Sequence, residues 1–243
     1  MAILRPRPRH GRRDFIREVG IIVVGVLIAL AGEQLVEWLD WQNKAGEARV
    51  ALRDEIIDGY LSSGERIVQT PCLNSQLDRL KARVLAPGDT LAPATLIASN
   101  MGPRVLVQPS RLWSDTFWQN VRSEQIASHL GDRERIDITT FYNSIAVMRR
   151  LNQDEITANG ELMALASPLP LDPAVRARFV ALIETARARA NFMDLVARQQ
   201  RSVAREIVPD IASRAAAADR AGPMGSFTIG YFRAQRLPLA RAP

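Results

Sequence analysis

The longest apolar stretch of the chain lies near its N-terminus. Residues 19–32 (VGIIVVGVLIALAG) carry no charge, and fourteen helical residues span about 21 Å at 1.5 Å per residue. This is shorter than the roughly 30 Å hydrocarbon core of a bilayer. Apolar residues extend the stretch on both sides, with Phe15 before it and Trp38 after it, where tryptophan suits the membrane interface. The pattern predicts a tilted transmembrane helix over residues 15–38.

Helical periodicity dominates the rest of the chain. Apolar residues three and four positions apart, together with residues that start and stop helices, predict helices over 33–69, 71–86, 94–99, 110–122, 123–130, 131–167 and 173–208. The last of these is expected to reach Val208 or to continue through Pro209. The start at Pro71 rests on Thr70 as N-cap followed by proline, and Asp172-Pro173 gives the same signal. Val105–Val107 are expected to be extended. The predicted fold class is all-α, with the transmembrane helix continuing into an antiparallel helical bundle.

Four regions follow from this pattern. Residues 1–14 form a basic cytoplasmic tail, 15–38 the membrane helix, 39–219 an extracytoplasmic helical domain and 220–243 a flexible C-terminal tail. The orientation comes from charge, because six arginines precede the apolar stretch, whereas the first charged residues after it are Glu33, Glu37 and Asp40. By the positive-inside rule, the N-terminus is cytoplasmic and the main domain of this bacterial inner-membrane protein is periplasmic.

A cleaved export signal is the main alternative to a retained anchor. Ala29-Leu30-Ala31 has the small-residue pattern of a cleavage site after Ala31, and residues 12–16 (RRDFI) resemble a twin-arginine signal. A helix that is buried or lies on the membrane surface is a third interpretation. The retained anchor is favoured because residues 32–41 (GEQLVEWLDW) continue the helical pattern without the break that cleavage sites usually show.

The sequence resembles a family of uncharacterised single-pass membrane proteins of proteobacteria. The resemblance lies in FIREVGIIVVGVLIALAGEQLVEWLDW, in the following EARVALRDEI, and in WSDTFWQNVRSEQIASHL at 113–130. A related family of unknown function opens with a similar E-x-x-I-x-x-x-G-x-L-I-A-L anchor. The resemblance covers about residues 13–60 and 110–145. It implies a membrane-anchored helical protein and carries no activity with it.

Small residues mark one face of the predicted membrane helix. Gly25, Ala29 and Gly32 are spaced by four and three residues, so they share a face on which two helices can approach closely. The expected partners are therefore the lipid bilayer, a second copy of the chain through this face, and an unidentified protein partner.

Motifs for catalysis or for metal binding are missing from the sequence. The two histidines, His10 and His129, and the one cysteine, Cys72, fit no metal-ligand spacing, and no phosphate-binding loop or nucleophile elbow occurs. We expect no cofactor. The net charge of +6 lies mostly in the first 18 residues, so the main domain is nearly neutral and nucleic acid is not an expected partner.

An aromatic cluster is the strongest candidate for a functional site. Trp113, Phe117 and Trp118 would anchor the bundle core, or line a ligand pocket with Arg122 and Glu124 as its polar part. The interpretation that fits all of these patterns is a non-enzymatic membrane-anchored module, acting as a scaffold, a sensor or an envelope-interaction protein. An enzyme with an unrecognised site is the alternative.

Overall fold

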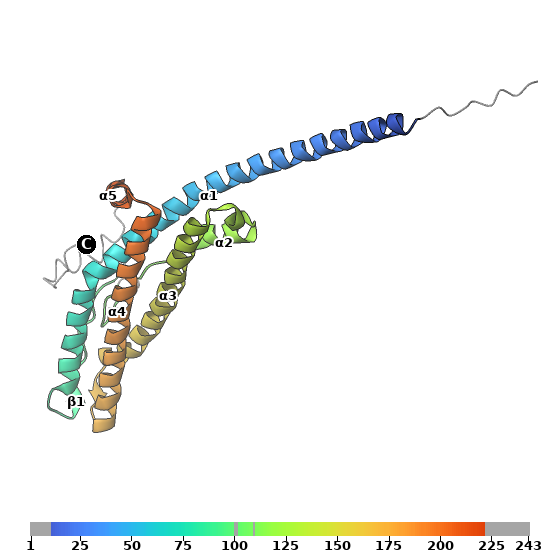
Figure 1. Ribbon diagram of the computed structural model, residues 1–243. Helices are drawn as coiled ribbons and strands as arrows, with labels where there is room; N and C mark the ends of the chain where they lie inside the picture. The colour runs from blue at the N-terminus through green and yellow to red at the C-terminus, as the bar shows by residue number, and fades with distance from the viewer. Residues whose placement is uncertain (1–10, 100–101, 109, 222–243) are drawn as a thin grey trace, which may run out of the picture.

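The computed structural model describes residues 11–99, 102–108 and 110–221, and most of them are helical (Figure 1). Five α-helices pack as a bundle, as the sequence predicts. They are α1 (Arg12–Leu85), α2 (Thr116–Ser123), α3 (Asp132–Leu162), α4 (Pro173–Ile207) and α5 (Ile211–Ala221). Two 3-10 helices, η1 (Ile126–His129) and η2 (Met163–Ala166), and two short strands complete the described elements.

The starts of the two long C-terminal helices agree with the prediction. Gly131 is the N-cap of α3 and Asp172 that of α4, where the Asp172 carboxylate accepts a hydrogen bond from the backbone N–H of Val175. The chain ends α4 at Ile207 and starts α5 at Ile211, so the predicted continuation of the last long helix through Pro209 is wrong. The predicted tail over 220–243 lies outside the described residues from 222 onwards.

The predicted helix break at Thr70-Pro71 is wrong, because α1 is a single helix of 74 residues with Pro71 inside it. Proline removes one helical hydrogen bond and costs about 3 kcal/mol. The Thr70 hydroxyl donates a hydrogen bond to the Arg66 carbonyl, one turn earlier in α1, at 2.9 Å. Packing against α4 on both sides of Pro71 keeps the helix continuous, and α1 curves along its length (Figure 1).

The three long helices interlock through a regular pattern of buried positions. In α1 and α4 these positions alternate between spacings of three and four, the pattern of coiled-coil packing. In α3 they follow the same pattern except for a spacing of seven from Met148 to Glu155. They are Leu52, Ile56, Gly59, Ser63, Arg66, Thr70, Leu73, Leu77, Leu80 and Val84 in α1; Ile138, Phe141, Ile145, Met148, Glu155, Asn159 and Leu162 in α3; and Phe179, Ile183, Ala186, Ala190, Met193, Ala197, Gln200 and Ala204 in α4.

The direction of the helices is fixed by contacts between them. α4 runs antiparallel to α1, as the Ser63–Gln200 hydrogen bond and the Asp78–Arg187 ion pair show. α1 and α3 run parallel, since Arg49 pairs with Glu134 and Arg66 with Glu155. Two parallel neighbours require a crossover that returns along the bundle, so the connection from α1 to α3 is long. The predicted antiparallel arrangement therefore holds for α1 and α4 but is wrong for α1 and α3.

An extended segment makes that crossover, and we call residues 105–108 and 110–115 the strap. The side-chain amide of Gln76 on α1 pairs with both the N–H and the carbonyl of Val107, each at 3.0 Å. Asn159 on α3 donates to the Leu106 carbonyl at 2.9 Å. The strap therefore lies in the groove between α1 and α3. Its backbone bonds to side chains of these helices, which explains why the helix predicted from Ser110 is wrong up to the start of α2 at Thr116.

Two further expectations about the connections are wrong. The helix predicted over 94–99 is absent, because Ile97 exchanges backbone hydrogen bonds with Arg104 at 2.7 and 2.8 Å in an extended bridge. The all-α expectation also missed a small ladder in which β1 (Thr90–Leu91) pairs antiparallel with β2 (Leu169–Pro170). This ladder joins the connections at the end of the bundle far from the N-terminus of α1 (Figure 1). Residues 105–107 are buried but form no strand.

A layer of buried polar side chains divides the apolar core into two clusters. One cluster takes α1 residues from Ala45 to Ile67, and the other takes α1 residues from Leu73 to Val84. Between them lies the polar layer, formed by Ser63, Arg66, Gln69, Thr70, Glu155 and Gln200, each of which is at most 7% exposed. Buried polar side chains need partners, so this layer ties α1, α3 and α4 into one register.

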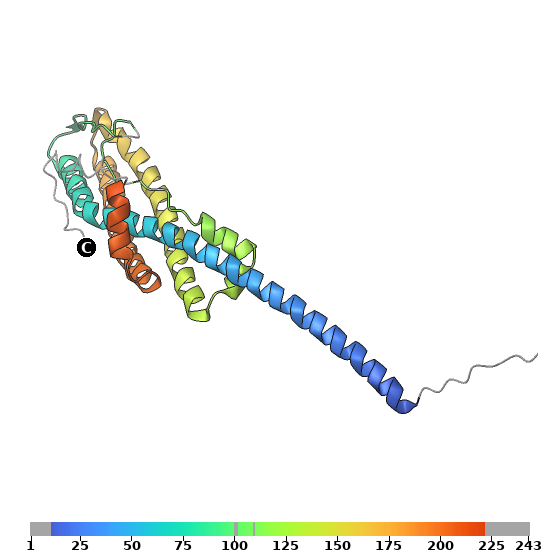
Figure 2. The same cartoon turned by 90° about the horizontal axis from the view of Figure 1, so that it is seen from above.

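The N-terminal half of α1 leaves the bundle altogether. Figure 2 shows it extending well beyond the other helices, and its apolar side chains between Phe15 and Leu39 are exposed. The first buried residue of α1 is Ala45. Next to it, Trp41 stacks on His129 of η1 with ring centroids 4.1 Å apart. Together, Ala45 and the Trp41–His129 stack mark the point where α1 joins the bundle.

Candidate functional site

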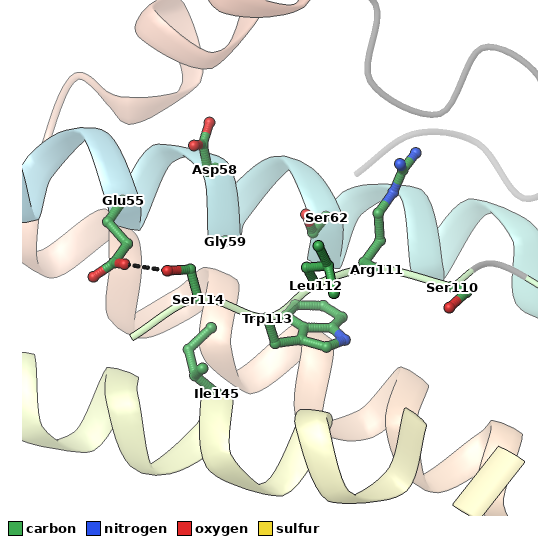
Figure 3. Close-up of a pocket in the computed structure, with 10 residues that line it drawn as sticks. All are labelled: Glu55, Asp58, Gly59, Ser62, Ser110, Arg111, Leu112, Trp113, Ser114 and Ile145. Atoms are coloured by element: carbon green, nitrogen blue, oxygen red, sulfur yellow. Dashed lines mark hydrogen bonds between the residues drawn. The ribbon is translucent and has the colours of Figure 1, made fainter. Parts of the chain in front are cut away.

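A pocket of about 410 Å³ lies between α1 and the strap (Figure 3). Three elements line it: α1 with Glu55, Asp58, Gly59 and Ser62, the strap with Ser110, Arg111, Leu112, Trp113 and Ser114, and α3 with Ile145. The pocket exists because the strap is extended here, since an extended chain fills less of the groove between α1 and α3 than a helix would.

Glu55 is a buried, hydrogen-bonded carboxylate of the pocket. Its side chain is held by two hydroxyl donors, Ser114 Oγ at 2.5 Å and the Tyr142 hydroxyl at 2.7 Å, and the residue is 7% exposed. Burial, followed by the hydrogen bond to Glu55, raises the pKa of Tyr142 far above its usual value, so Tyr142 remains a donor at neutral pH. Glu55 is thus a buried carboxylate fixed by neutral donors from the strap and α3.

Asp58 and Arg111 form the outer part of the pocket. In Figure 3 both project to the side of α1 and the strap away from Ile145. The pKa of Asp58 is raised by partial burial and by the negative charges of Asp54 and Glu55. Arg111 forms an ion pair with Glu65, so its charge is already engaged by a carboxylate that does not line the pocket.

Trp113 forms an aromatic wall. It is 5% exposed, and its indole Nε1 has no hydrogen-bond partner among the described residues. Arg149 of α3 fixes the backbone here, because its guanidinium donates to the Trp113 carbonyl at 2.7 and 3.1 Å and pairs with Asp115 at 2.6 Å. The hydrogen bond from Arg149 lowers the pKa of Asp115. The neighbouring Leu112 is 99% exposed.

The structure separates the predicted aromatic cluster into different environments. Trp113 and Trp118 are buried, whereas Phe117 is 47% exposed. Trp118 stacks on Tyr142 at 5.6 Å and, with Arg122, lines a second, more open hollow of about 530 Å³ between α2 and α3. Glu124 is the C-cap of α2 and lines neither of these two pockets.

Sequence reasoning missed the carboxylate at the centre of the pocket. Glu55 is not among the site residues predicted from the sequence, although it stands next to Ile56 in the buried register of α1. This position is the one signal that could have indicated burial. Its partners Ser114 and Tyr142 lie 59 and 87 residues further along the chain, a distance over which sequence spacing gives no information about contact.

The remaining titratable candidates offer no nucleophile or metal site. Cys72 is fully buried, and burial raises the pKa of its thiol to about 11, which disfavours the reactive thiolate. Within the described part of the chain, no three His, Cys, Asp or Glu side chains come together as metal ligands. His129 ends η1 and is engaged by the Trp41 ring.

The predicted association face of α1 stands free of the bundle. Gly25, Ala29 and Gly32 are exposed, and a Cβ added at either glycine would meet no atom within 4 Å. Among the described residues, α1 is the one helix long and apolar enough to cross a membrane, and its most apolar 18-residue window has a mean hydropathy of 2.3. Such a segment is typical of a membrane anchor or of a signal sequence.

Comparisons of the chain with protein-family profiles, with curated proteins and with solved structures gave no match.

Proposed function

We propose that the chain is a single-pass protein of the bacterial inner membrane whose bundle is a non-enzymatic periplasmic module, acting as a scaffold, a sensor or an envelope-interaction protein. The observation that carries this proposal is the exposed N-terminal half of α1. Apolar side chains from Phe15 to Leu39 cover that half and none packs on the bundle. A helix that is apolar on all sides needs an apolar environment, and here the bilayer supplies it.

Charge gives the orientation of the anchor. The arginines before the apolar stretch stay in the cytoplasm, and the bundle is exported. Binding is favoured over catalysis because the buried Glu55 is already engaged by the Ser114 and Tyr142 hydroxyls and is not poised as a free base.

Signal cleavage is the competing proposal. Ala31 and Ala45, the first buried residue of α1, are fourteen positions apart, so cleavage after Ala31 would remove none of the core contacts of the bundle. The retained anchor is supported by the continuity of α1, which passes through Ala31 as regular helix. A direct measurement must therefore distinguish the two proposals.

Membrane fractionation and mass spectrometry of the full chain test the anchor. We expect the protein to stay with the membranes after a carbonate wash and its first residues to be retained. A mature N-terminus at Gly32 would instead establish the cleaved signal. Alkaline phosphatase fused after Pro243 should be active, since the C-terminus is periplasmic. Activity of a cytoplasmic reporter at the same position would contradict the proposed orientation.

A further inference from the structure

The pocket between α1 and the strap has the size and the fixed walls of a small-molecule site. Its volume of about 410 Å³ lies within the range of roughly 300–1,000 Å³ usual for ligand pockets. Glu55 and Trp113, both less than 8% exposed, are held in place by protein contacts on α3 and the strap. The walls are therefore preorganised, which reduces the entropic cost of binding.

The lining of the pocket carries a net negative charge. Glu55 and Asp58 line it, Asp54 lies near Asp58, and the one basic lining residue, Arg111, is paired with Glu65. Partial burial raises the pKa of Asp58, and repulsion from the negative charges of Asp54 and Glu55 raises it further. A cation in the pocket would relieve this repulsion.

The aromatic wall formed by Trp113 sets a second requirement for the ligand. The Trp113 ring offers an apolar surface that also attracts cations. Its Nε1 is a buried donor without an acceptor among the described residues, and leaving such a donor unpaired is unfavourable. A ligand oxygen that reached this side of the pocket would supply the missing acceptor.

We propose that this pocket binds a small organic cation of the amino-alcohol class, with its ammonium group in the negative field of Asp58 and Glu55 and its hydroxyl near the Trp113 indole. The inference concerns the bundle alone and holds whether the N-terminal helix is retained or cleaved. It gives the sensor interpretation a definite ligand chemistry.

Calorimetric titration of the full chain in detergent tests the proposal, with choline as the probe. We expect saturable binding of one choline per chain. The uncharged isostere 3,3-dimethylbutan-1-ol has the same shape without the charge, so it should bind about five-fold more weakly, the upper end of the range for a partly exposed charge pair. Equal binding of both compounds, or no saturable heat with choline, would overturn the proposal.

Three variants test whether choline binds in this pocket. Asp58→Asn removes a charge from an exposed carboxylate and should weaken choline binding about three- to five-fold, whereas Glu161→Gln, on an exposed position of α3 away from the pocket, should leave it unchanged. Trp113→Phe keeps an aromatic ring, although a smaller one, and removes the N–H, so it should weaken choline binding more than tetramethylammonium binding. Equal affinities of the Asp58 and Glu161 variants would overturn the site, and equal losses of both cations in the Trp113 variant would overturn the role of the hydroxyl.

Discussion

Arg66 of α1 and Glu155 of α3 form an ion pair in the middle of the bundle, joined by hydrogen bonds of 2.8 and 2.5 Å. Their side chains are 2% and 3% exposed. The pair lies between two apolar clusters, so each charge depends on the other for compensation. A buried pair of this kind adds little net stability, but it penalises any helix register that separates its members.

Removal of one member of this pair should therefore destabilise the bundle strongly. We expect Glu155→Gln or Arg66→Met to lower the free energy of unfolding by about 3–5 kcal/mol, because each leaves a buried charge without its partner. The double variant Arg66→Met with Glu155→Leu should recover most of that loss. Urea denaturation followed by circular dichroism measures both effects, and strictly additive losses in the double variant would contradict the prediction.

Gly59 allows α1 to approach α3 and α4 closely. A Cβ at this position would stand 2.7 Å from the Phe141 ring and 3.3 Å from Gln200 Nε2. Gly59→Ala should therefore destabilise the bundle by about 1–3 kcal/mol, although alanine is the better helix former. Gly46→Ala is the matched control, since nothing lies within 4 Å there, and it should stabilise α1 by up to about 1 kcal/mol. Thermal unfolding should show opposite signs for the two variants.

Trp118 and its neighbour Phe117 should differ sharply in their contributions to stability. Trp118 is 6% exposed and stacks on Tyr142, whereas Phe117 is 47% exposed. Trp118→Ala should cost about 3–5 kcal/mol because it leaves a cavity, and Phe117→Ala should cost about 1 kcal/mol or less. Chemical denaturation of the two variants decides this, and similar losses would show that Phe117 packs more tightly than its exposure indicates.

The reactivity of the Cys72 thiol should report on unfolding, and its ionisation should make stability depend on alkaline pH. Burial raises its pKa from 9.0 to about 11, so the protonated thiol is favoured in the folded state. The resulting stabilisation is fully present below pH 9 and is lost as the pH rises from about 9 to 11. At pH 8 we expect Ellman's reagent to modify Cys72 only after unfolding by urea. Cys72→Ala should flatten the dependence of stability on pH in that window, and rapid labelling of the folded protein would contradict the prediction.

Gly25 should control association of the membrane helix. Two helices can approach closely at Gly25 and Ala29, where side chains are small. In a bacterial transmembrane-association reporter that carries residues 13–42, Gly25→Leu should reduce the signal severalfold, whereas Val24→Leu on another face should not. Equal signals from both variants would favour a monomer.

Local signals determined much of the architecture from the sequence alone. Hydrophobic patterning and capping signals indicate three features: the uncharged stretch at 19–32, the start of α4 at Asp172-Pro173 and the start of α3 at Asp132. These features depend on residues within one or two helical turns. They are therefore readable without any knowledge of which segments meet in space.

Tertiary packing decided the features on which the pocket depends. Pro71 stays inside α1 because α4 supports the helix on both sides of it, which a local stop signal cannot reveal. The strap is extended because Gln76, Asn159 and Arg149, which lie between 31 and 53 residues away, bond to its backbone. Glu55 is buried because Ser114 and Tyr142 reach it from the strap and α3. Local periodicity determines which residues form helices. Contacts between distant segments determine where an extended segment replaces a helix and where a carboxylate is buried.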